Sequence, residues 1–309
     1  DDVEILFIPS NPSDSAEMAR HAIDLDQSSE AAHLLLAELA LDERRYDDAS
    51  LMTEQALSIN ANSFEARSLR AAIAYIEDRI DEFEAEVTGV LALNPSYGEI
   101  YRVTGAQAAS HYRFDEAVVL VRKALDLSPG SPLAQAELGM HLLRTGDEVG
   151  ARENLDQSFE ADPFNIVTFN LLRMLDAVDE FETIRKGDLV VRLHPDEFPV
   201  MGDYVVSLAS QALETLGGRY GVEVDGPILI EVFPRHDDFA VRNLGLPGMI
   251  GALGACFGRV VTMDSPRARP PGTFNWQATL WHEMAHVITL QMSRNRVPRW
   301  LTEGISVYE

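Results

Sequence analysis

The stretch TLWHEMAHVITLQ (279–291) places two imidazoles and a carboxylate in an otherwise largely apolar run. His282 and His286 are four residues apart, so on a helix they lie about 40° apart on one face, one turn from each other. That spacing lets both rings reach one ion at the roughly 2.0–2.1 Å of a zinc–nitrogen bond. Glu283 points partly off that face, so it can reach a water on the metal without being a ligand. The pattern predicts a zinc site with Glu283 as general base.

A catalytic zinc site has three protein ligands and one open position, so a third ligand is needed. Glu303 stands 17 residues after His286, which is enough for one helix to end and a second to return antiparallel beside it. It lies between Leu301 and Ile305 on a largely apolar helix, a position that a solvated glutamate would not need. We therefore predict Glu303 as the third ligand, with His282 and His286.

These motifs carry a family resemblance. HEMAHV (282–287) followed by VPRWLTEGISVYE (297–309) resembles the gluzincin metallopeptidases, in particular the peptidase-MA-like group with its H-E-x-x-H…P-x-W-[L/F]-x-E-G pattern. The resemblance covers about residues 180–309. It implies that His282, His286 and Glu303 bind Zn²⁺ and that Glu283 activates a water. It also implies a small sheet over the motif helix, whose edge strand holds an extended substrate. In this sequence that role would fall on the strand near GRVVTMD (258–264).

Two features depart from the family pattern. Thermolysin-like members have an Asp four residues after the third ligand that orients the first histidine, but Val307 stands here, with Ser306 and Glu309 as the nearest polar side chains. The family also completes its cleft with a following helical lobe, which supplies a Tyr or His to the oxyanion. The sequence ends at Glu309, so no such residue can be assigned. We expect the peptidase lobe to be incomplete on its C-terminal side.

The residues before this lobe form a repeat array with a period of 34 residues. Small residues and prolines recur at that spacing, in the series Ala37, Ala71, Gly105 and Gly139, the series Ala49, Phe83, Ala117 and Ala151, and the series Ala61, Pro95, Pro129 and Pro163. The pattern predicts two antiparallel helices per repeat and resembles tetratricopeptide (TPR) repeats. Full repeats cover about 30–163, with partial repeats at both ends. We expect the groove of the array to bind a peptide or partner protein; alternatively, the array only supports the next domain.

The pattern changes near residue 184. The segments 188–195, 226–234 and 254–264 are typical of strands, and 199–221, 274–293 and 299–309 are typical of helices. His194 and His236 are predicted to be loop residues. The glycine-rich stretch 245–258 lacks the register of a phosphate-binding loop. The predicted fold is mainly α: a TPR α-solenoid over 1–180, followed by an α+β zincin-like catalytic lobe over 181–309.

Composition restricts the function further. A chain of 309 residues is long enough for about two domains. A formal net charge of −25 argues against non-specific binding to nucleic acid or to an anionic membrane surface, and no apolar run is long enough to be transmembrane. The single cysteine, Cys256, excludes an intramolecular disulfide and leaves both cytoplasm and periplasm open. The family resemblance suggests a bacterial cell envelope.

Together these features predict a zinc-dependent peptidase whose repeats recruit protein substrates or partners. One alternative is a catalytically inactive TPR scaffold that retains the zinc site. The presence of Glu283 opposes it, because a structural site needs no base. The other alternative is a zinc hydrolase, such as an amidase, acting on a non-protein substrate.

Overall fold

The computed structural model describes residues 12–249 and 251–309, so residues 1–11 of the predicted solenoid and Ile250 of the glycine-rich stretch lie outside it. The chain forms two compact units. The first comprises Asp1–Ala108 and Val119–Pro129, and the second comprises Ala109–Val118 and Gly130–Glu309. The predicted domain boundary at 180/181 lies within the second unit, because the last helical repeat belongs to the same compact unit as the mixed lobe.

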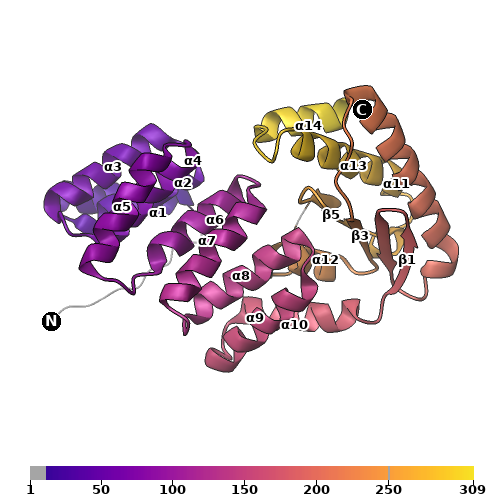
Figure 1. Ribbon diagram of the computed structural model, residues 1–309, viewed down its shortest axis with the longest axis horizontal. Coiled ribbons are helices and arrows are strands. Elements are labelled where there is room, and N and C mark those ends of the chain that lie inside the picture. Colours follow the sequence, from indigo (N-terminus) through magenta and orange to yellow (C-terminus); the bar gives the residue numbers. More distant parts are fainter. Residues whose placement is uncertain (1–11, 250) are drawn as a thin grey trace. The chain divides into compact units, whose positions relative to one another are not determined.

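The first unit is built of paired helices, coloured indigo to purple in Figure 1. They are α1 (Pro12–Leu25), α2 (Glu30–Asp42), α3 (Tyr46–Ile59), α4 (Phe64–Ile76), α5 (Ile80–Leu93), most of α6 (Glu99–Ser110) and the later part of α7 (Phe114–Leu127). Consecutive helices of a repeat pack together, and small side chains such as Ala37, Ala49 and Ala72 are fully buried between them. This confirms the predicted helical repeats: the chain contains a TPR-like solenoid.

The turn between the two helices of each repeat has the same backbone conformation. Arg44, Asp78, Tyr112 and Gly146 all have positive φ, at 61°, 58°, 64° and 88°, and they follow one another at the 34-residue period. Only the last is glycine, the residue that adopts this conformation most easily. The repeat geometry is therefore maintained at positions where the sequence alone gives no turn signal.

The second unit continues the repeats with α8 (Pro132–Thr145), α9 (Glu148–Ala161) and α10 (Ile166–Val178). Gly139 shows how closely α8 and α9 approach, since a Cβ there would lie 2.6 Å from Leu155 Cγ. After α10 the chain forms a small mixed sheet of β1 (Glu182–Lys186), β2 (Leu189–Leu193), β3 (Ile228–Phe233), β4 (Gly254–Cys256) and β5 (Val260–Asp264). The strand order is β1-β2-β3-β5-β4. β2, β3 and β5 run parallel, and the two outer strands are antiparallel to their neighbours.

The sheet presents two buried faces. Ile228, Ile230 and Val232 of β3 join the core formed with α11 (Phe198–Tyr220) and α13 (Trp276–Met292). The intervening residue Glu231 is also fully buried, and it contacts Arg242 of α12 (His236–Leu244). Alternation along the strand therefore sends apolar side chains to one face and a charged one to the other. The short 3₁₀ helix Pro266–Ala268 and the terminal helix α14 (Arg299–Tyr308) complete the unit.

Several sequence-based predictions need correction here. The strand β1 and the helix α12 were not predicted, and the predicted strand segment 254–264 folds as a hairpin of β4 and β5. The prediction that the strand near GRVVTMD lies at the edge of the sheet is wrong. That strand is β5, which lies between β3 and β4, and β4 forms the edge. His236 begins α12 instead of lying in a loop. Each error concerns a short segment, and the two missed strands are formed by antiparallel pairing with the strand that follows each of them.

A buried ion pair joins the last repeat to the lobe. Arg242 Nε donates to Glu231 Oε2 at 2.8 Å, and Arg242 Nη2 donates to the Leu143 carbonyl of α8 at 2.9 Å. Both charged side chains are almost inaccessible to solvent. Arg192 of β2 binds Glu148 of α9 and lies 3.7 Å from Glu231 Oε1. Because buried charges are costly unless they are paired, this network fixes how α8 and α9 pack on the sheet.

We predict that Arg242→Met lowers the free energy of unfolding of the second unit by about 3 kcal/mol, because Glu231 is left buried without its main partner. The change is measured by denaturant titration followed by tryptophan fluorescence, since all three tryptophans lie in α13 and α14. Arg185→Met, at an exposed position of β1, is the matched control and is expected to change the free energy of unfolding little. An Arg242→Met effect no larger than that of the control would contradict this account.

Candidate metal centre

Helix α13 presents the H-E-x-x-H motif through its packing. Its start is capped by Asn275, whose side chain accepts a hydrogen bond from the Ala278 amide. Leu280, Met284, Val287 and Ile288 are fully buried in the core with the sheet and α11. Burial of that face orients the other face, with the two histidines, toward α14.

The structure brings the three predicted ligands together. His282 Nε2 lies 3.1 Å from His286 Nε2, and Glu303 Oε2 lies 3.5 Å from the first nitrogen and 3.4 Å from the second. A tetrahedral zinc with bonds of roughly 2.0–2.1 Å separates its ligand atoms by about 3.3 Å. The donor atoms thus already have the spacing and chemistry of a zinc site, and they form the one such group of three found among the described residues.

A chain of hydroxyl groups holds His286 in position. Its Nδ1 lies 2.7 Å from Thr302 Oγ1, which lies 2.6 Å from Thr289 Oγ1. Thr289 in turn donates to the backbone carbonyls of α13 at 3.1–3.2 Å. If each hydroxyl donates along this chain, Thr302 accepts from the Nδ1–H of His286. That tautomer directs the Nε2 lone pair toward the other two ligands, as metal binding requires.

In the family pattern an acidic residue after the third ligand orients a ligand histidine, and none of the residues near that position does so here. Val307 is largely exposed, and the hydroxyl of Ser306 is buried without a hydrogen-bond partner in the described chain. Glu309 binds Arg219 and accepts from Tyr220 Oη at 2.6 Å, so it attaches α14 to α11. The supporting residue is instead Thr302, next to Glu303 in sequence, and it acts on the second histidine. It was missed because the family pattern directs attention to an acid.

The ionisation of the site follows from burial. Burial lowers the pKa of His286 to about 4, so this imidazole is neutral near pH 7 and has a lone pair for a metal. Burial, and then the charge of Glu303, raise the pKa of Glu283 to about 8 in the chain by itself. A cation at the ligand group would favour the carboxylate.

Glu283 lies against the edge of the sheet. A Cβ at Gly254 of β4 would come within 2.5 Å of Glu283 Oε1, so only glycine leaves room for this carboxylate. Glu283 Oε2 is buried and has no hydrogen-bond partner among the described residues. An unpartnered carboxylate oxygen beside three ligand atoms is suited to bind a water or a proton of a substrate.

A cavity of about 600 Å³ contains these groups. Its wall includes all four predicted site residues, Gly254–Cys256 of β4, the loop 251–253, and Tyr112 and Arg144 from the repeats. The loop is fixed by His236, which lies 3.0 Å from Asp264 Oδ2 and 2.8 Å from the Met249 carbonyl. Arg269 Nε donates to Asp264 Oδ2 at 2.6 Å, and Arg269 Nη2 donates to the Ala252 carbonyl at 3.1 Å. His236 therefore supports the wall of the cavity and is not part of the ligand group found among the described residues.

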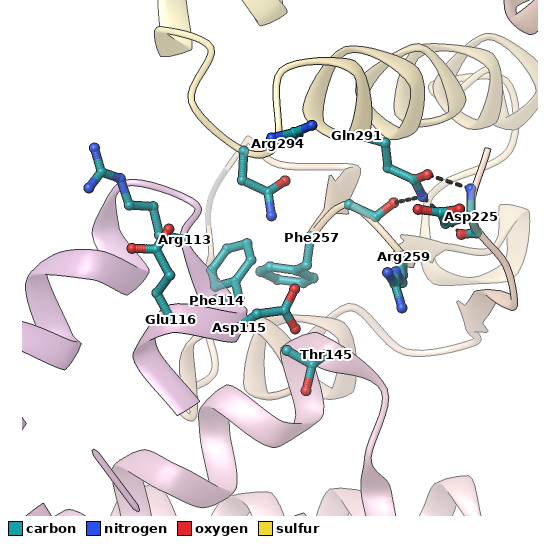
Figure 2. A pocket seen from close by; sticks show the side chains of 12 residues that line it. Arg113, Phe114, Asp115, Glu116, Thr145, Asp225, Phe257, Arg259, Gln291 and Arg294 are labelled. Atoms are coloured by element: carbon teal, nitrogen blue, oxygen red, sulfur yellow. Dashed lines mark hydrogen bonds between the residues drawn. The ribbon is translucent and has the colours of Figure 1, made fainter. Parts of the chain in front are cut away.

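A second, smaller cavity of about 230 Å³ has Phe257 in its wall. Figure 2 shows Phe114 and Phe257 side by side in its wall, with Arg113, Arg259 and Arg294 around them. The side chain of Gln291 closes one end, accepting from the Asp225 amide at 2.8 Å and donating to the Gly258 carbonyl at 3.1 Å. Phe257 lines both cavities.

Comparisons with known proteins give matches among solved structures. No family model and no curated protein matches the chain. Among solved structures, the chain is similar to YrrB, a TPR protein with an unusual peptide-binding site, at 17% identity over 52% of this chain and 84% of that chain, with a TM-score of 0.32. It is similar to a thermophilic TPR protein of Thermus thermophilus (14% identity, 51% and 87%, TM-score 0.41) and to PilF of Pseudomonas aeruginosa (21%, 54% and 76%, TM-score 0.34).

All three structures have TM-scores below 0.5, and none of the comparisons tests the peptidase interpretation. The plain description of the fold is a mainly helical, TPR-like solenoid with a small mixed sheet. In the part of the chain that the structure describes, no helix combines the length and apolar character needed to cross a membrane.

We predict that Thr302→Val weakens zinc binding by about 10-fold or more, because His286 loses the partner that fixes its tautomer and ring orientation. Zinc affinity is measured by competition with a chromogenic chelator. Thr279→Val is the matched control: Thr279 lines the same cavity, but among the described residues its hydroxyl donates only to the Asn275 carbonyl. Equal zinc affinities for the two variants would show that the hydroxyl chain does not support the ligand.

Proposed function

We propose that the chain is a zinc-dependent peptidase that hydrolyses peptide bonds through a metal-activated water. The observation that carries this proposal is the group of His282, His286 and Glu303, whose donor atoms lie 3.1–3.5 Å apart beside the buried carboxylate of Glu283. A purely structural site would use its fourth position for another ligand and would have no need of a base. Here the fourth side of the donor group faces a cavity.

The roles of the residues follow from their positions. Bound zinc would polarise the scissile carbonyl and make a water acidic at neutral pH. Glu283 accepts the proton of the attacking water and donates it to the leaving amine nitrogen. Gly254 keeps the carboxylate of Glu283 against the edge strand, and Thr302 keeps the His286 ring in its binding orientation.

The edge strand β4 provides a place for an extended peptide. In its pairing with β5, Asp264 N donates to Leu253 O and Phe257 N donates to Val260 O. Antiparallel alternation then directs the N–H and C=O groups of Gly254 and Cys256 away from β5. Both residues line the cavity, so a substrate that adds a strand here would pass beside Glu283 and the ligand group. This supports a peptide over a compact substrate of another class.

The TPR-like repeats would recruit protein substrates or partners through their groove. A second candidate function is a TPR interaction scaffold that retains the metal site without catalysis. The repeat array itself favours it, because stacked helical repeats present an extended concave surface to a partner. The two candidates differ in one respect: only the peptidase depends on Glu283.

We predict that Glu283→Gln and Gly254→Ala each retain one zinc per chain and each lower peptide hydrolysis at least 100-fold. The first variant removes the base; the second places a methyl group where the Glu283 carboxylate lies and displaces it. Hydrolysis is measured with a quenched fluorescent peptide library. Gly130→Ala, where a Cβ meets nothing within 4 Å, is the control and is expected to retain activity.

No hydrolysis of any peptide by the zinc-loaded protein would favour the scaffold function instead. Hydrolysis that persists undiminished in Glu283→Gln would exclude the proposed role of this carboxylate.

A further inference from the structure

One wall of the zinc-site cavity is supplied by the last repeat. Arg144, in the final turn of α8, lines this cavity together with Tyr112 from the preceding interhelical turn. Its guanidinium carbon lies 5.7 Å from the ring centroids of both Phe114 and Phe257. Contact with two aromatic rings holds the planar guanidinium in one orientation.

Arg144 has no acidic partner among the described residues. Its Nη2 makes a long hydrogen bond of 3.4 Å to the Asn243 carbonyl, and its Nε is buried without a partner. The charge that influences it is another cation, Arg242, which is paired with Glu231. Burial and Arg242 lower the pKa of Arg144 to about 10, which leaves it charged near pH 7.

The rest of the cavity offers Arg144 no counter-charge. Its two carboxylates, Glu283 and Glu303, belong to the proposed base and ligand, and neither forms an ion pair with Arg144 in the described structure. Burying part of a guanidinium without an anion beside it costs free energy. An anionic group of a bound substrate that accepts two parallel hydrogen bonds from the guanidinium would offset that cost.

We propose that Arg144 binds a carboxylate of the substrate, so that this site selects peptides carrying a carboxylate close to the scissile bond. The proposal rests on the proposed peptidase function and specifies its substrate class. The carboxylate can be the C-terminus of a short peptide or an Asp or Glu side chain. The chemistry at Arg144 is the same for both, and the experiment distinguishes them.

The test measures binding to the zinc-loaded protein, without turnover. The probes are mercaptoacetyl peptides with one, two or three alanines, each prepared with a free C-terminal carboxylate and with a C-terminal amide. The thiol binds the zinc, and the series varies the distance from it to the carboxylate. A third set ends in an amidated glutamate and presents a side-chain carboxylate instead. Affinities are measured by calorimetry, and zinc content is determined for every variant.

We expect at least one acid probe, or one glutamate probe, to bind about tenfold or more tightly than its uncharged counterpart. Arg144→Gln should bring this ratio close to one without changing zinc content or the affinity for the amide probe. Arg144→Lys should retain part of the ratio, since it keeps the charge but not the planar fork. The matched control is Arg259→Gln. Arg259 lines the smaller cavity (Figure 2) and is not among the described residues that line the larger one, so this variant should retain the full ratio.

Three results would overturn the proposal: ratios near one for every probe length in the parent protein, an unchanged ratio in Arg144→Gln, or loss of the ratio in Arg299→Gln instead. Arg299 is the other cation of this cavity and lies 3.6 Å from Glu303. If Arg144→Gln fails to fold, the parent protein and Arg144→Lys decide the question. Failure of the peptidase proposal is recognised separately. A chain that binds zinc but hydrolyses no peptide still allows the thiol probes to report on Arg144, and a chain without zinc is identified by the zinc determination.

Discussion

The candidate site depends on the return of α14 against α13. Two attachments fix that return. Near the start of α14, Thr302 joins the hydroxyl chain with Thr289 and His286, and at its end Glu309 binds Arg219 and Tyr220 of α11. Between these attachments Glu303 comes within 3.5 Å of both histidine nitrogens. Without this packing, α13 would present only two of the three ligands.

The same constraint extends into the sheet and the last repeat. The apolar face of α13 packs on the core of the sheet, which places Glu283 against Gly254 at the edge strand. The sheet is joined to α8 by the Arg242–Glu231 pair and by the bond from Arg242 to the Leu143 carbonyl. Leu143 precedes Arg144, so the interaction that packs the last repeat on the lobe also brings Arg144 to the cavity wall. The helical repeats thus contribute directly to the candidate site.

Local sequence patterns predicted the elements that repeat or that are long and amphipathic. The 34-residue period predicted the paired helices, and the spacing of His282, Glu283, His286 and Glu303 predicted a group that the structure assembles. Very short strands, and contacts between different elements, could not be predicted from the sequence. The edge strand β4 is three residues long, and Thr302 is recognisable as a supporting residue only when α14 lies beside Thr289. Arg144 lies more than a hundred residues before the motif helix, and no sequence pattern connects them.

The most direct test of the central claim is the zinc K-edge X-ray absorption spectrum of the purified, zinc-supplied protein. The account predicts a first shell of two imidazole nitrogens and oxygen ligands at about 2.0–2.1 Å, with no sulfur at about 2.3 Å. The absence of sulfur is informative because Cys256 lines the same cavity. No bound zinc near pH 7, a sulfur ligand, or a shell without the two imidazoles would contradict the proposed centre. The repeat array would then be the remaining candidate for a functional surface.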